Sequence, residues 1–142
     1  EPAALAEALV RRLRPHLGPE DLLVLNGEVE AAQALGTGLH LPQRRLAALS
    51  GRPELPWVGA SAHGVDALRR AEALGLDYAV LGPVRSTRSH PGASALGWQG
   101  FREIARDAAI PVYAIGGLGP EDLEDARRAG AHGVAAIRAW WD

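Results

Sequence analysis

The chain has 142 residues, of which 47% are hydrophobic and 23% charged, and its net charge is −2 at pH 7. This composition is typical of a globular protein with its own core, and we interpret residues 1–142 as a single domain. The near-neutral charge argues against binding to nucleic acid or to an anionic membrane, so a small metabolite is the expected partner. Cysteine and lysine are absent, which excludes disulfides, thiolate metal sites and Schiff-base chemistry.

The chain carries no sign of a membrane segment or a secretory leader. No apolar run approaches the roughly 18 residues that would span a bilayer, and the N-terminus lacks the basic and then apolar layout of a secretory signal. We therefore expect a cytoplasmic protein. Because the sequence has no methionine and opens within an expected helix, we also expect a segment upstream of residue 1.

Helices and short apolar strands alternate along the whole chain. In chain order we expect a helix over 2–13, a strand over 22–25, a helix over 29–35, a strand over 38–41, a helix over 44–49, a strand over 57–60, a helix over 65–74, a strand over 78–81, a helix over 98–107, a strand over 112–115, a helix over 120–129 and a strand over 134–137. The helix at 120–129 has the clearest ends, because proline and acidic residues open it and arginines followed by glycine close it.

Unbroken apolar strands separated by helices predict a parallel α/β sheet with both faces covered. We predict a TIM-type (β/α) barrel of which about six βα units are visible. A closed barrel needs eight strands and typically about 250 residues, so the first strands are expected to be absent or supplied by another segment. An open doubly wound sheet is the alternative. Exposed strand edges would favour a homo-oligomer or an upstream segment that completes the barrel.

Two expected strands run into loops that suit an anion. The loop after strand 78–81 contains Thr87, Ser89 and His90, and the strand 112–115 leads directly into Gly116 and Gly117. Hydroxyl groups and the amides of a glycine pair donate hydrogen bonds to phosphate oxygens, and barrel phosphate sites favour the loops after the last two strands. A polar surface loop and a tight strand-to-helix turn are the simpler interpretations. We predict that the chain binds a small phosphorylated metabolite.

Several motifs occur in the order and at the spacing of one known family. They are Gly-Ala-Ser-Ala-His at 59–63, Asp-Tyr-Ala-Val-Leu-Gly-Pro-Val at 77–84, the loop 87–92, Leu-Gly at 96–97, Ile-Pro-Val-Tyr-Ala-Ile-Gly-Gly at 110–117 and Gly-Ala-His-Gly-Val-Ala at 130–135. From about residue 22 to residue 139, the chain resembles the thiamine phosphate synthase and TenI superfamily. The resemblance implies a (β/α) barrel that binds a thiazole phosphate at the carboxyl ends of its strands.

The resemblance also implies a place for the phosphate. Gly116 and Gly117, together with the backbone near Ile137 and Arg138, would hold the phosphate of the thiazole. Arg138 could add a bidentate contact, and a solvated arginine at a helix start is the alternative for this residue.

Further ligand contacts follow from the same resemblance. Thr87, Ser89 and His90 would lie over the second ligand, where the synthases clamp a diphosphate with a lysine at the place of His90. A histidine is only partly charged near neutral pH, so this replacement weakens the clamp. Asn26 and Ser61 would contact the ring region, although an asparagine after a strand is also a common turn residue.

The metal ligands of the synthases are replaced in this chain. Family synthases carry an aspartate directly after the asparagine and a second one after the next strand, and both help to hold Mg²⁺. This sequence has Gly27 and Arg45 at those places. We therefore predict no cofactor and no metal, and Mg²⁺-dependent displacement of diphosphate is not carried over.

A histidine is the residue type on which metal-free chemistry would depend. The TenI-type tautomerases shift a proton on a thiazole carboxylate phosphate, and their histidine follows the glycine of the Leu-Gly-Pro-Val strand end. Here that place is Pro83. His63, at the end of its own expected strand, is the remaining acid/base candidate, with a hydrogen-bonded structural histidine as the alternative. We assign structural or surface roles to three further histidines, His16, His40 and His132.

Three functions remain open from the sequence. The first is an enzyme of thiamine biosynthesis that acts on a thiazole phosphate, either as a synthase-like transferase or as a tautomerase-like isomerase. The second is a non-catalytic sensing or regulatory domain that kept the phosphate site and lost the chemistry. The third is another phosphate-binding barrel, such as an isomerase or epimerase of sugar phosphates, which would leave the 61–63 and 87–90 elements unexplained.

Overall fold

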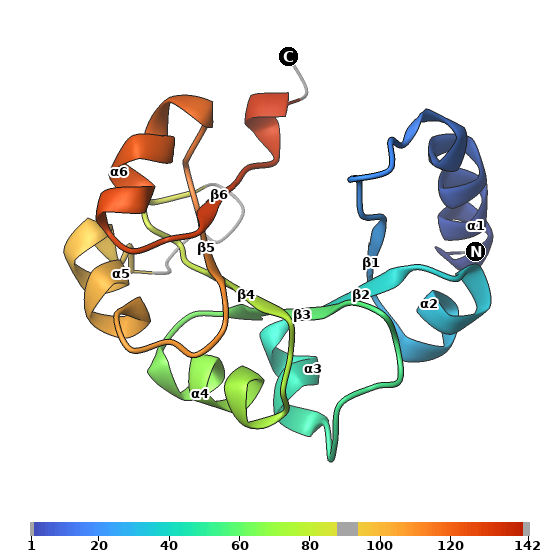
Figure 1. Ribbon diagram of the computed structural model, residues 1–142, viewed down its shortest axis with the longest axis horizontal. Coiled ribbons are helices and arrows are strands. Elements are labelled where there is room, and N and C mark those ends of the chain that lie inside the picture. The colour runs from blue at the N-terminus through green and yellow to red at the C-terminus, as the bar shows by residue number, and fades with distance from the viewer. Residues whose placement is uncertain (1, 88–93, 141–142) are drawn as a thin grey trace.

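The computed structural model describes residues 2–87 and 94–140 of the chain. Its centre is one sheet of six parallel strands, each paired with the next along the sequence. The strands are β1 (Val24–Asn26), β2 (Gly38–Leu41), β3 (Val58–Ala62), β4 (Tyr78–Leu81), β5 (Val112–Ile115) and β6 (Gly133–Ala135). The sheet curls into a half-barrel with the helices around its outside (Figure 1). This arrangement confirms the predicted TIM-type α/β fold.

Helices connect the strands, and further helices precede the first strand and follow the last one. They are α1 (Pro2–Leu13), η1 (Arg14–His16), α2 (Val29–Leu35), α3 (Gln43–Ala48), α4 (Val65–Ala73), α5 (Gly97–Ala105), η2 (Pro120–Asp122), α6 (Leu123–Arg128) and η3 (Arg138–Trp140). Among the residues that the structure describes, none of these helices has the length and apolar character needed to cross a membrane.

The strand side chains alternate between the helices and the inner face of the curled sheet. In β2, Leu39 and Leu41 are buried in a core beneath the helices, whereas His40 between them is only partly buried. The same alternation in β4 leaves Tyr78 partly buried. Because successive side chains of a strand point to opposite faces, the polar residues at these positions lie on the inner face of the half-barrel.

The last strand is shorter than the sequence predicts and begins one residue earlier. We expected 134–137, but β6 ends at Ala135, which is in register with Ile115. Since Ile115 is the last residue of β5, the ladder has no partner strand beyond it. Ile137 and Arg138 therefore lie after the strand, and both are exposed.

Smaller differences affect two other elements. The strand expected at 22–25 is Val24–Asn26, because Val24 is in register with Gly38, the first residue of β2, while Leu22 is exposed. The helix expected at 120–129 begins as the tighter 3₁₀ turn η2 before it continues as α6. The remaining helices and strands agree with the sequence-based bounds to within two residues.

Candidate functional site

A cavity of about 290 Å³ lies where β3, β4, β5 and β6 end. Parallel strands bring their carboxyl ends to one edge of a sheet, so loops that are distant in sequence meet there. Six residues singled out from the sequence line this cavity, namely His63, Thr87, Gly116, Gly117, Ile137 and Arg138. The Thr87 loop and the glycine pair thus lie on the same rim.

The glycine pair allows two loops to pack closely at this rim. Gly116 has φ 110° and Gly117 has φ 64°, both in the left-handed region that side chains disfavour. A Cβ at Gly116 would lie 2.6 Å from the Cα of Pro83, in the loop after β4. The carbonyl of Gly116 also accepts a hydrogen bond from the backbone N–H of Arg85 at 3.0 Å. Glycine at 116 is therefore required by both conformation and space.

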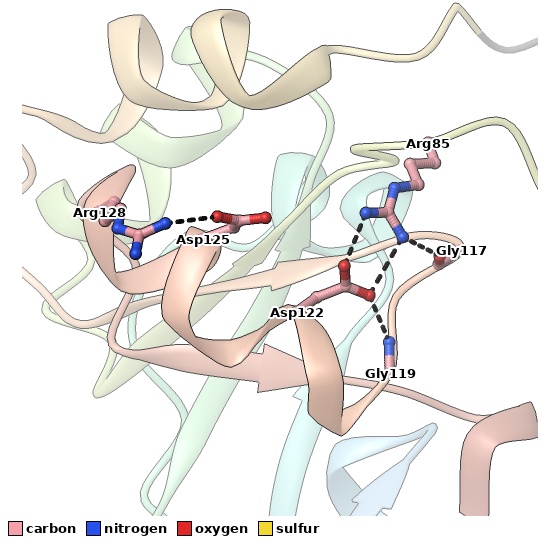
Figure 2. Close-up of polar contacts among 6 residues, drawn as sticks. All are labelled: Arg85, Gly117, Gly119, Asp122, Asp125 and Arg128. Carbon is pink, nitrogen blue, oxygen red and sulfur yellow. Dashed lines mark hydrogen bonds and ion pairs between the residues drawn. The ribbon is translucent and has the colours of Figure 1, made fainter.

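An ion pair holds the same two loops together (Figure 2). The guanidinium of Arg85 donates to both carboxylate oxygens of Asp122, at 2.6 and 3.1 Å, and to the carbonyl of Gly117 at 3.2 Å. The backbone N–H of Gly119 also donates to Asp122, at 2.9 Å. Asp122 is 4% exposed, so these donors satisfy a buried carboxylate.

These contacts set the protonation of the buried carboxyl. Burial alone would raise the pKa of Asp122, but the hydrogen bond from Gly119 and the guanidinium of Arg85 outweigh it and lower the pKa below its ordinary value. Asp122 is therefore ionised at neutral pH and fixes the turn that follows the glycine pair.

Thr87 brings an unsatisfied hydroxyl to the cavity. Its Oγ1 is buried and has no hydrogen-bond partner within the part of the chain that the structure describes. Buried hydroxyls are hydrogen-bonded in most proteins, so an exception at a cavity wall is a candidate ligand contact.

His63 is held at the mouth of the same cavity. Its Nδ1 lies 2.8 Å from the carbonyl oxygen of Gly82, which can only accept, so Nδ1 carries a proton. The backbone N–H of His63 donates to the side-chain oxygen of Gln43 at 2.7 Å. The imidazole is thus oriented by the end of β4, and the residue by α3.

A second, larger cavity of about 500 Å³ lies on the inner face of the half-barrel. Its lining includes His40, Tyr78 and Tyr113, and Ala135 lines this cavity as well as the first one. The two cavities therefore adjoin at β6. Apart from Asp77 and His40, the residues that line the second cavity are apolar or aromatic, which suits a ring more than a phosphate.

Comparison with known proteins identifies the family of the chain. A family model described as thiamine monophosphate synthase matches residues 2–140. The chain belongs to this family. The resemblance found in the sequence motifs is thereby confirmed.

Individual members of the family show how much of their length the chain spans. It is 34% identical over 139 residues to the thiamine-phosphate synthase of Azorhizobium caulinodans, which is 94% of this chain and 64% of that protein. It is 33% identical over 124 residues to the thiamine-phosphate synthase of Methanococcus maripaludis, covering 83% of this chain and 58% of that protein. The structure of a thiamine phosphate pyrophosphorylase from Pyrococcus furiosus superposes with a TM-score of 0.73 at 26% identity, over 96% of this chain and 66% of that one. The chain thus spans about three fifths to two thirds of these relatives.

An ion pair lies at Arg45 and beside Gly27, the two positions where the resemblance implied metal-binding aspartates. Arg45 donates to the carboxylate of Glu28, which follows Gly27, and both side chains are about half exposed. Within residues 2–87 and 94–140, no three histidine or acidic side chains are placed to share a metal ion. A guanidinium repels a divalent cation, which disfavours Mg²⁺ at this ion pair, and the absence of a metal stays a prediction.

The structure separates two other predicted site residues from the first cavity. Asn26 and Ser61 do not line it; Asn26 is in register with His40, and Ser61 is hydrogen-bonded to His40. Ser89 and His90 lie outside the described residues. The binding roles of all these residues stay predictions.

Sequence reasoning missed four residues of the site region. Arg85 and Asp122 were not paired, and His40 was assigned a structural or surface role although it lines the second cavity with Tyr78. One pattern could have drawn attention to two of them. His40 and Tyr78 are polar or aromatic residues at positions that alternate with buried aliphatic residues in short strands, which is typical of an inner barrel face.

Proposed function

We propose that this protein binds a thiazole phosphate in thiamine biosynthesis, with the phosphate in the first cavity. The observation that carries the proposal is the meeting of four loops at one cavity of about 290 Å³, in a member of the thiamine monophosphate synthase family. The hydroxyl of Thr87 and backbone amides at the glycine pair donate to the phosphate oxygens. Arg138 adds positive charge from the segment after β6. The thiazole ring extends past Ala135 toward the second cavity.

The proposed chemistry uses no metal. The ion pair between Arg45 and Glu28 takes the place where the synthases hold Mg²⁺, so no step is assigned to that ion. His63 lies at the mouth of the phosphate cavity, with the proton on Nδ1 fixed by Gly82. An imidazole oriented in this way can take part in proton transfer, which is the requirement of a tautomerase-like isomerisation.

A sensing or regulatory domain is the second candidate function. The observation that favours it is the same Arg45–Glu28 pair, because the cavity proposed for the phosphate keeps its predicted lining residues while a guanidinium stands where a metal-binding aspartate was expected. Such a domain binds the thiazole phosphate and catalyses no reaction.

Calorimetry tests the binding half of the proposal. We expect the protein to bind a thiazole phosphate, and to bind the dephosphorylated thiazole alcohol and a pentose phosphate at least ten-fold more weakly. Thr87→Ala should weaken binding of the thiazole phosphate, whereas Ser86→Ala, the exposed neighbouring hydroxyl, should not. Tighter binding of the pentose phosphate would favour a sugar-phosphate barrel instead.

Turnover assays then separate the two candidates. Proton exchange or isomerisation of a thiazole carboxylate phosphate without Mg²⁺ supports the enzyme, and binding without any turnover supports the sensor. Diphosphate release from an aminopyrimidine diphosphate that depends on Mg²⁺ would contradict the metal-free proposal.

A further inference from the structure

Three side chains on neighbouring strands form one continuous hydrogen-bonded chain across the inner face. Nε2 of His40 on β2 lies 2.8 Å from Oγ of Ser61 on β3, and Nδ1 of His40 lies 3.1 Å from the hydroxyl of Tyr78 on β4. Both imidazole nitrogens are therefore engaged by groups that can each donate or accept a proton.

The absence of a side chain at Gly59 makes this chain possible. His40 is in register with Gly59, and Gly59 with Tyr78, so β3 separates the histidine from the tyrosine. A Cβ at Gly59 would lie 2.1 Å from Cζ of Tyr78, which shows that the tyrosine ring lies directly over this glycine. The ring stacks near His40, with centroids 5.7 Å apart, and meets the edge of Tyr113 at 6.1 Å. The phenol is thus packed in place.

The environment keeps both titrating groups neutral near pH 7. Burial lowers the pKa of His40, and burial, with Tyr113 and Asp77 nearby, raises the pKa of Tyr78 to about 12. Tyr78, Tyr113 and Asp77 are the titratable groups that line the same cavity as His40. Asp77 is engaged by Arg52 at 2.8 Å and by the backbone N–H of Val58 at 2.7 Å.

A neutral imidazole between two hydroxyl groups has two equivalent arrangements. In one, the Ser61 hydroxyl donates to Nε2 and the Nδ1–H donates to the oxygen of Tyr78. In the other, Nε2–H donates to Ser61 and the Tyr78 hydroxyl donates to Nδ1. The arrangements differ only in the direction of the protons, so the chain can pass a proton from one end to the other.

The two ends of the chain have different surroundings. Tyr78 lines the second cavity. Ser61 lines neither cavity; it is only partly buried, near the carboxyl end of β3, and His63, which lines the first cavity, follows two residues later. The chain therefore runs from the second cavity toward the carboxyl end of β3.

We propose that Ser61, His40 and Tyr78 form a proton relay from the carboxyl end of β3 to the second cavity, which serves a ligand bound at the strand ends. The proposal rests on the proposed binding of a thiazole phosphate. A C–H or N–H proton of the ligand passes to Oγ of Ser61 as the hydroxyl proton of Ser61 passes to Nε2 of His40. The Nδ1 proton then passes to the oxygen of Tyr78, and the phenolic proton leaves into the second cavity. One proton enters the relay and one leaves it, so the relay itself stays neutral. The electron pair of the broken bond stays on the ligand, which takes a proton back when the relay runs in the reverse direction. Ser61 is the catalytic residue, and His40 and Tyr78 are positioning residues that act through it.

Proton exchange in D₂O tests the relay. A thiazole carboxylate phosphate is incubated with the protein, deuterium incorporation is followed by NMR, and ligand affinity is measured separately by calorimetry. We expect His40→Gln and Tyr78→Phe to slow exchange about 100-fold while the affinity changes less than two-fold. His132→Gln, the same change at an exposed histidine, should leave the rate unchanged. The exchange rate of the wild-type protein should fall only at pH values below the range in which histidine ordinarily titrates. This fall at acid pH should be absent in His40→Gln.

The outcomes distinguish the relay from the proposed function. A wild-type protein that does not bind the ligand overturns the proposed function and the relay with it. A wild-type protein that binds without exchange, or a His40→Gln variant that exchanges at the wild-type rate, overturns the relay alone. If the variants do not fold, ¹⁵N NMR of the wild-type histidines decides. A ring of His40 with one protonated and one bare nitrogen at pH 7 supports the relay, and an imidazolium overturns it.

Discussion

Arg85 and Asp122, 37 residues apart in sequence, connect the loop after β4 to the turn before α6 by two hydrogen bonds at 2.6 and 3.1 Å. The glycine pair lies between these two segments, and the carbonyl of Gly117 accepts from the same guanidinium. The shape of the proposed phosphate site thus depends on an ion pair between the buried carboxylate of Asp122 and the half-exposed guanidinium of Arg85, neither of which lines the first cavity.

Removal of the Asp122 carboxylate should destabilise the fold. Asp122→Ala leaves the buried N–H of Gly119 without its acceptor, for which we expect a loss of about 1–3 kcal/mol in the free energy of unfolding. Because the pKa of Asp122 is lower in the folded than in the unfolded chain, its contribution is complete above the unfolded value near 4 and is lost as the pH falls through the folded value. Urea denaturation between pH 7 and pH 2 measures both effects. In Asp122→Asn, which keeps an acceptor but cannot ionise, this acid-dependent loss should be absent. An unchanged acid profile in that variant would contradict the assignment.

Gly59→Ala should displace Tyr78. The new Cβ would overlap the tyrosine ring, so we expect a loss of about 1–3 kcal/mol in unfolding free energy and a broken contact between Tyr78 and His40. Thermal or urea unfolding measures the first, and the ring resonances of His40 report the second. Gly51→Ala, where a Cβ meets nothing within 4 Å, should change stability by less than about 0.5 kcal/mol. Combining Gly59→Ala with Tyr78→Ala should recover part of the loss, and strict additivity would rule out the proposed clash.

Gly116→Ala should abolish phosphate binding as well as destabilise the protein. The residue has a left-handed φ of 110°, and a Cβ would lie 2.6 Å from the backbone of Pro83, so the two loops must separate. Gly130→Ala provides the matched control, because Gly130 has φ 91° but an added Cβ meets nothing within 4 Å. The unfolding free energy of the control should fall only by the strain of a left-handed alanine, about 1–2 kcal/mol, and its affinity for a thiazole phosphate should stay unchanged. Equal loss of affinity in both variants would show that strain, and not loop separation, is responsible.

Magnesium should not stabilise this protein. Arg45 and Glu28 already neutralise each other where a metal would need carboxylates, so millimolar MgCl₂ should leave the melting temperature unchanged. The double variant Gly27→Asp with Arg45→Asp places carboxylates at both positions and should gain a magnesium-dependent rise in melting temperature. Gly27→Ala with Arg45→Ala controls for the loss of the guanidinium alone. A magnesium-dependent rise in the wild type would contradict the proposal.

Local patterns were sufficient to predict most of the fold. Each apolar run pairs with the next along the chain, and each helix between them has its own apolar face, so the alternation alone indicates a parallel sheet. The error at β6 arose because Ile137 continues an apolar run, while the strand ends where its partner β5 ends. The extent of a strand depends on its neighbour, which no local pattern contains.

The sequence by itself determined the family, the order of helices and strands, and the loops that would meet at one edge of the sheet, because these follow from nearest-neighbour periodicity and from motifs in order. Only the tertiary structure decided which polar groups pair. His40 meets Ser61 and Tyr78 across 21 and 38 residues, through strand register and the missing side chain of Gly59. Arg85 reaches Asp122 in the same way, because two loops pack over glycines that admit no Cβ. Such pairings depend on distances between backbones that are set by the packing of the whole sheet.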